Sequence, residues 1–147
     1  MKLRHLLPAL LVAFGLGAAP ILLDECATVA DWTGARPPTA VAAVDSPFPG
    51  QQAVQVTMPG MVTRQLTRTQ VPGSAAWDGY AGVSFWVKGD GSDQYGCLAL
   101  VGPYPFVTYF PLANQEWHQL VVPWHDFVPE SQVDPIGSYG EIGRAHV

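Results

Sequence analysis

Apolar and polar residues alternate along several short segments in the second half of the chain. From position 83 to position 88, every second residue is large and apolar. The apolar face of these segments comprises Val83, Phe85, Val87, Leu98, Leu100, Leu120 and Val122, and the opposite face comprises Ser84, Trp86, Lys88, Cys97, Ala99, Gln119 and Val121. Because successive side chains of a strand point to opposite faces, the pattern predicts strands with one aliphatic and one mixed face.

Turns rich in Gly and Pro separate the predicted strands. We expect strands at residues 21–26, 39–45, 51–58, 62–71, 83–88, 95–101, 106–110 and 117–122. No segment of useful length has helical periodicity, and no repeat or linker is visible. The spacing predicts an all-β sandwich of one domain, with the mixed faces outward. In the strand 106–110, either Phe106 and Phe110 lie in the core and Tyr109 outside, or the reverse.

The composition agrees with a folded, strand-rich domain. The chain has 147 residues, of which 48% are hydrophobic and 13% charged, with 15 Gly and 14 Pro. These values exclude disorder, coiled coil and collagen. The net charge is −5, and residues 20–140 hold 4 basic side chains against 11 acidic ones, so we expect no nucleic-acid partner.

The first 19 residues have the layout of a secretory signal peptide. Lys2 and Arg4 precede an apolar stretch at residues 6–16, and three small residues follow it at 17–19. The alternative is an uncleaved membrane anchor, but Pro8 and Pro20 interrupt a run that barely reaches spanning length. We expect a secreted or periplasmic protein with no stable membrane insertion after cleavage.

The last seven residues have an unusual sequence. One back-translation of residues 141–147 resembles the start of a common short-read sequencing adapter. The alternative is an ordinary exposed tail. We expect an adapter-derived end, with the genuine sequence stopping near Gly140 inside the domain.

An ordered set of motifs carries a family resemblance. It runs from Trp77-Asp78-Gly79-Tyr80 through the strand 83–88, the Gly89-Asp90-Gly91 turn and Glu116-Trp117 to Pro123-Trp124-His125-Asp126-Phe127. This order resembles the jelly-roll group that unites the complex I intermediate-associated protein family with family 11 carbohydrate-binding modules, in the galactose-binding-like fold. The resemblance covers residues 24–139 and is weak before Trp77.

The resemblance implies a jelly-roll β-sandwich that lacks its closing strands, because members of the group continue past an aromatic-rich segment to strands that have no counterpart here. Binding residues of the family that lie there cannot be carried over. The group often holds a structural calcium ion near its first strand, where this chain offers the hard oxygen ligands Asp24, Glu25 and Asp45. Trp117 and Trp124 are expected to be scaffold.

The outward face offers side chains suited to sugars. Pyranose rings stack on aromatic side chains through their C–H faces, and amides or cations bind their hydroxyls. The candidate ligand-binding residues are Trp86, Lys88, Tyr95, Tyr109 and Gln119. Alternatively, a tryptophan in a strand packs in the core.

The two cysteines both survive signal cleavage. A disulfide between Cys26 and Cys97 would stabilise the fold by about 4 kcal/mol in an oxidising compartment. The alternative is a pair of free, buried thiols.

Catalytic motifs are missing from the sequence. The segment around Ser84 lacks the final glycine of a nucleophile elbow, His118 and His125 are not spaced as a metal pair, and the carboxylates are scattered singly. We therefore expect a secreted, non-catalytic module that tethers an attached domain to a polysaccharide such as a β-glucan. Two alternatives stay open, namely an ancillary domain of a glycan- or ester-active hydrolase with a downstream catalytic part, and a protein-binding assembly module.

Overall fold

The computed structural model describes residues 3–6, 11–14, 19–33, 39–58, 67–68, 77, 79–101, 103 and 105–130, the first two ranges by their backbone alone. Strands dominate these residues, and the described helical elements are short 3₁₀ turns such as Val29–Asp31 and Trp124–Asp126. The expectation of an all-β, sandwich-like fold is confirmed. Most of the predicted strand 62–71 and the tail 141–147 lie outside the described residues.

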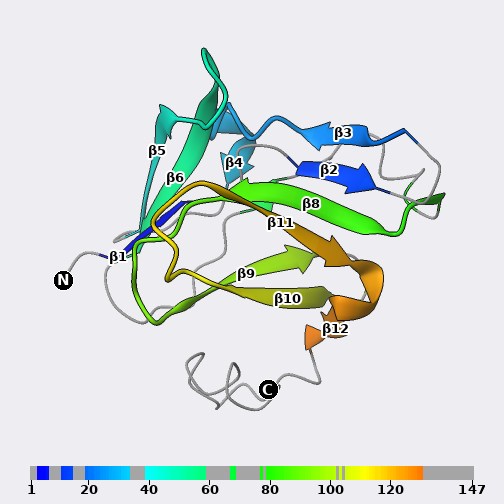
Figure 1. Cartoon of the computed structure of the whole chain (residues 1–147). Helices are drawn as coiled ribbons and strands as arrows, with labels where there is room; N and C mark the ends of the chain where they lie inside the picture. Colours follow the sequence, from blue (N-terminus) through cyan, green and yellow to red (C-terminus); the bar gives the residue numbers. More distant parts are fainter. Residues whose placement is uncertain are drawn as a thin grey trace.

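Every pairing among the described strands is antiparallel. The strands are β1 (Leu3–Leu6), β2 (Leu11–Phe14), β3 (Ile21–Asp24), β4 (Trp32–Thr33), β5 (Ala40–Asp45), β6 (Gln52–Met58), β7 (Thr67–Arg68), β8 (Gly82–Val87), β9 (Tyr95–Leu100), β10 (Phe106–Pro111), β11 (His118–Pro123) and β12 (Val128–Pro129). The sheet orders are β1-β6-β5, β12-β10-β9, β11-β8-β2-β3 and β4-β7. Figure 1 shows β8 and β11 above β9 and β10, with the hairpin β5–β6 to one side. Each predicted strand has a counterpart, whereas β1, β2, β4 and β12 were not predicted.

The core lies between the sheet β11-β8-β2-β3 and the sheet β12-β10-β9. Phe85 of β8 meets Phe110 of β10 edge to face, with ring centroids 5.4 Å apart. Val83 and Val87 are fully buried beside Phe85, and aliphatic side chains of β9 and β11 pack against them. The predicted aliphatic face is therefore the buried face of both sheets.

The open question about the strand 106–110 is answered by β10. Phe110 is a core residue, whereas Tyr109 lies on the opposite face of its strand. Phe106 keeps 40% of its surface exposed. Only one of the two phenylalanines thus serves the core.

The turn after β8 connects strands of two different sheets, and only one of its two glycines has a positive φ. Gly91 has a φ of +81°, a conformation that favours glycine, and the Asp90 carboxylate accepts the backbone N–H of Ser92 at 2.9 Å. A side chain at Gly89 would overlap the backbone carbonyl of Leu112. These contacts fix the end of β8 against the loop that leads into β11.

The segment around Trp124 is scaffold, as predicted. The indole of Trp124 stacks on Trp77 with ring centroids 5.8 Å apart and donates its N–H to the carbonyl of Tyr80 at 2.5 Å. Phe127 enters the core. The Asp126 carboxylate lies 3.3 Å from the His125 ring instead of accepting a backbone N–H of the turn.

The N-terminal segment takes part in the sheets of the full chain. β1 pairs with β6, and β2 lies between β8 and β3. Within the described ranges, no helix has both the length and the apolar character needed to cross a membrane.

Candidate functional site

Three of the five predicted ligand-binding residues share the outer face of β8 and β11. Trp86 and Lys88 alternate with core residues of β8, so their side chains point away from the core. Gln119 of β11 lies directly opposite Trp86 in the antiparallel register. Side chains of such pairs stand close together on one face. We call Trp86, Lys88 and Gln119 the outer platform.

Polar and aromatic contacts order the outer platform. The side-chain N–H of Gln119 donates to the hydroxyl of Ser84 at 3.2 Å, which leaves the amide oxygen of this exposed residue for a ligand. The Trp86 ring is half-buried and meets the ring of Phe48 edge to face, with centroids 5.6 Å apart. The platform therefore combines a fixed aromatic ring with an accessible amide.

Phe48 was missed as a functional candidate because its segment was interpreted only as a turn. It lies in the loop between β5 and β6, where the Ser46 hydroxyl accepts the backbone N–H of Phe48 at 3.0 Å and donates to its carbonyl at 3.1 Å. The N–H of Gln51 also donates to the Phe48 carbonyl, at 3.1 Å. An aromatic residue between two prolines was the available signal.

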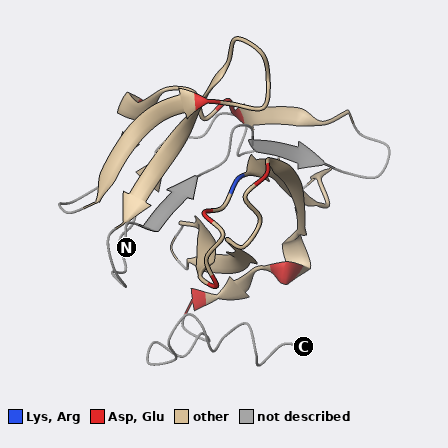
Figure 2. Ribbon diagram, turned by 60° about the vertical axis from the view of Figure 1, so that its left-hand side comes forward, with Lys and Arg blue, Asp and Glu red and all other residues tan. Residues whose placement is uncertain are grey.

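Lys88 adds a cation beside this surface. It is half-buried, and among the described residues it forms no ion pair. Figure 2 shows the acidic residues mainly along turns and at strand ends. The Lys88 ammonium group can therefore donate hydrogen bonds to hydroxyl groups of a ligand on the outer platform.

The other two predicted residues lie on the outer face of the opposite sheet. Tyr109 comes directly before the core residue Phe110 on β10, so its side chain points to the opposite face. On β9, Gly96 pairs with Phe110, and Tyr95 comes directly before Gly96, so Tyr95 lies on the same outer face as Tyr109. Since Phe85 and Phe110 meet inside the core, Trp86 and Tyr109 point outward from different sheets. The structure therefore does not bring all five candidate residues onto one surface, because alternation specifies the face of a strand but not the sheet that contains it.

The candidate disulfide between Cys26 and Cys97 is not formed in the structure. Cys26 is buried in the core just after β3, whereas Cys97 lies on the outer face of β9, where the residue as a whole is exposed but the surrounding protein restricts the solvation of its thiol. Restricted solvation raises the pKa of the Cys97 thiol to about 11, a hydrogen bond with Tyr109 opposes this shift, and the Glu130 carboxylate adds to it. The Cys97 thiol is therefore not set up as a nucleophile at neutral pH.

The predicted calcium ligands do not gather into one site. The Asp24 carboxylate accepts hydrogen bonds from Arg68 and from the backbone N–H of Cys26, the latter at 2.5 Å. Glu25 is exposed, and Asp45 ends β5 opposite Gln52. Across the described part of the chain, no three His, Cys, Asp or Glu side chains lie close enough to hold a metal ion. Asp24, Glu25 and Asp45 are therefore not shown as a ligand set.

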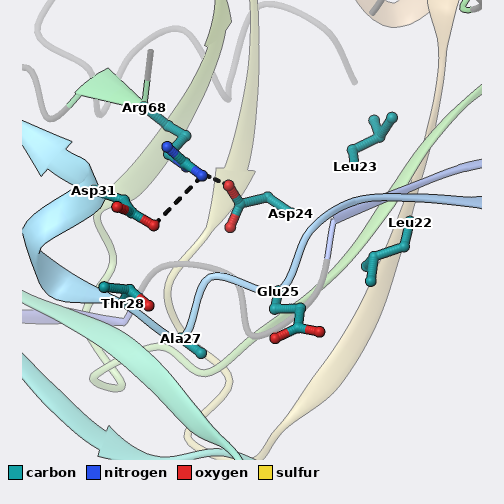
Figure 3. A pocket seen from close by; sticks show the side chains of 8 residues that line it. All are labelled: Leu22, Leu23, Asp24, Glu25, Ala27, Thr28, Asp31 and Arg68. Atoms are coloured by element: carbon teal, nitrogen blue, oxygen red, sulfur yellow. Dashed lines mark hydrogen bonds and ion pairs between the residues drawn. The ribbon is translucent and has the colours of Figure 1, made fainter. Parts of the chain in front are cut away.

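A pocket of about 280 Å³ lies at the end of β3. Its lining comprises Leu22, Leu23, Asp24, Glu25, Ala27, Thr28, Asp31 and Arg68. In Figure 3 the Arg68 guanidinium lies between Asp24 and Asp31, and the Glu25 carboxylate points away from it. The hydrogen bond with Asp24 is the largest cause of the raised pKa of Arg68. Arg68 pairs with two of the three carboxylates that line the pocket, as in a structural ion-pair network, and the lining keeps an excess of negative charge.

Comparisons with family models, with curated proteins and with solved structures found no match to the chain.

Proposed function

We propose that the protein is a secreted, non-catalytic carbohydrate-binding domain that tethers an attached domain to a polysaccharide such as a β-glucan. The observation that carries the proposal is the pairing of Trp86 with Gln119 on the outer platform. An aromatic ring next to an exposed amide matches the two needs of sugar recognition, which are a surface for C–H faces and a partner for hydroxyls.

The arrangement of the outer platform supports ligand binding without a catalysed reaction. Along the described strands of the platform, the accessible polar groups are an amide and an ammonium, whereas Ser84 is buried beneath Gln119. Neither accessible group is a carboxylate of the kind that glycoside hydrolysis needs. A single aromatic platform gives weak binding, with a Kd of about 10⁻⁴ to 10⁻⁵ M, or about 6 kcal/mol. A tether of this strength gains from multiple contacts along a polymer.

Affinity electrophoresis against a panel of soluble polysaccharides tests the proposal. The full chain should be retarded by at least one glycan, with mixed-linkage β-glucan as the first choice. Trp86→Ala should abolish the retardation, because it removes the aromatic surface of the outer platform. Gln119→Ala should weaken it.

Tyr109→Ala is the matched control, since it removes an outward aromatic side chain from the opposite sheet. This variant should bind like the unmodified chain. Thermal melts of all variants separate loss of binding from loss of fold. The proposal fails if no glycan retards the chain, or if the Trp86 and Tyr109 variants bind equally. If the chain binds no glycan of the panel, the protein-binding alternative is favoured.

A further inference from the structure

Lys88 is the one charged member of the outer platform. Its side chain is half-buried, and none of the ion pairs found among the described residues involves it. Burial removes part of the water around a charge, and a partly desolvated ammonium gains more from an anionic partner than from a neutral one. A ligand with an anionic substituent therefore satisfies this side chain best.

Carboxylates occur close to Lys88 along the chain and across the sheet, but they do not pair with it. Asp90, two residues further on, accepts the backbone N–H of Ser92 at 2.9 Å. Glu116 is exposed in the loop that leads into β11, next to the end of β8. Neither carboxylate is within ion-pair distance of the Lys88 ammonium group. These two neighbours thus leave the place of a counter-ion to a ligand.

The positions of the three platform residues suit one sugar ring and its substituents. Trp86 and Lys88 are separated by two residues on one face of β8, which corresponds to about 7 Å along the strand. Gln119 lies opposite Trp86, and is therefore the diagonal neighbour of Lys88. A ring stacked on Trp86 presents its rim to both polar side chains. A hydroxyl of the rim suits the amide oxygen of Gln119, and an anionic substituent suits Lys88.

We propose that the outer platform prefers acidic polysaccharides, whose sugar rings carry carboxylate or sulfate groups, and that Lys88 determines this specificity by binding the anionic group. The inference rests on the proposed function and narrows its ligand class. The formal net charge of −5 repels a polyanion at long range. At physiological salt, however, exposed charges more than about 8 Å apart are largely screened, so the direct contact with Lys88 decides the preference.

The test compares ligands that differ only in charge. The probes are oligosaccharides of mixed-linkage β-glucan, and the same oligosaccharides with their primary alcohols oxidised to carboxylates. Isothermal titration calorimetry with the full chain should show about fivefold tighter binding of the oxidised form, because a charge-assisted hydrogen bond is stronger than a neutral one. The preference should shrink as salt is added. A third set, sulfated at the primary alcohols, shows which of the two anionic groups binds more tightly.

Lys88→Gln should remove the preference for the oxidised form. Its affinity for the neutral oligosaccharides should stay within about threefold, since glutamine still donates hydrogen bonds to hydroxyls. This change also makes the net charge more negative by one. The matched control is therefore the double variant K88Q/E130Q, which restores the net charge by removing a carboxylate beside Cys97 on the opposite sheet. The double variant should bind like K88Q, and E130Q alone like the unmodified chain. Thermal melts establish that all variants are folded.

Three results would overturn the inference. The neutral oligosaccharides bind as tightly as both anionic sets, or K88Q keeps the preference, or K88Q/E130Q regains it and so shows that net charge alone is responsible. In each case the proposed function still stands, provided that the neutral oligosaccharides bind and Trp86→Ala abolishes their binding. If neither the panel of polysaccharides nor any of the three oligosaccharide sets binds, the proposed function itself fails and this inference with it.

Discussion

The outer face of β8 and β11 and the outer face of β9 and β10 arise from the same alternation, yet they present different chemistry to solvent. The first carries Trp86 opposite the exposed amide of Gln119. The second carries Tyr109 opposite Cys97, whose raised pKa reflects restricted solvation. The comparison teaches that a shared sequence pattern produces two separate surfaces, and the proposal of sugar binding concerns the first.

The largest expected effect comes from a substitution in the core that separates the two faces. Phe85→Ala should lower the free energy of unfolding by about 3–5 kcal/mol, because it leaves a cavity where the rings of Phe85 and Phe110 meet. Urea unfolding followed by tryptophan fluorescence measures the change. Phe106→Ala is the matched control, since this exposed ring should cost less than about 1 kcal/mol. Equal losses in the two variants would contradict the assignment of the buried face.

The sequence predicted much of the fold because period-two alternation is a local signal. Val83, Phe85 and Val87 were assigned to the core from their spacing alone, and the structure buries all three. The Gly91 turn was predicted from its residue types and has the expected positive φ. These features depend on backbone geometry within a few residues.

The site was predicted only in part because it depends on contacts between distant segments. The opposition of Trp86 and Gln119 follows from the register of β11 on β8, and the place of Tyr109 follows from the sheet to which β10 belongs. Phe48 reaches Trp86 from a loop nearly forty positions earlier in the chain. Alternation carries no information on such pairings, and the leader-like composition of residues 11–14 concealed the strand β2.

A second test compares neighbouring positions on the two sides of β9. Gly96→Ala should destabilise the protein by about 1–3 kcal/mol, because its new methyl group would overlap the Phe110 ring in the core. Cys97→Ala, one residue further on, faces outward and should change the free energy of unfolding by less than about 0.5 kcal/mol. Urea midpoints of the two variants give the difference. If Gly96→Ala leaves the free energy of unfolding unchanged, the face of β9 that carries Gly96 does not pack against the core.

A third test examines how the outer platform is supported. Phe48→Ala removes the edge-to-face partner of Trp86 and should weaken glycan binding about fivefold, since such a ring pair contributes about 0.5–1.5 kcal/mol. Affinity electrophoresis with the glycan that binds the unmodified chain provides the measurement. Phe106→Ala serves again as control, because its ring lies on the other sheet. Unchanged affinity in the Phe48 variant would show that Trp86 needs no support from the loop.

The smallest effect concerns the opposite face, where the pKa of the Cys97 thiol is raised to about 11. An unfolded cysteine titrates near pH 8.5, so the folded chain should react with iodoacetamide at Cys97 about 100-fold more slowly than the urea-unfolded chain at that pH. Peptide mapping by mass spectrometry follows Cys97 separately from Cys26. The rate in the folded chain should keep rising up to about pH 11.

The sign of the linked stability change follows from the same shift. The folded state holds the thiol proton more tightly than the unfolded state, so this group's contribution to stability is complete below about pH 8.5 and is lost as the pH rises toward 11. Tyr109→Phe removes the hydrogen bond that lowers the pKa and should slow alkylation further, whereas Glu130→Gln should speed it. A rate that levels off near pH 8.5 in the folded chain would mean that this face is as well hydrated as the outer platform, and the contrast between the two faces would then rest on their aromatic residues alone.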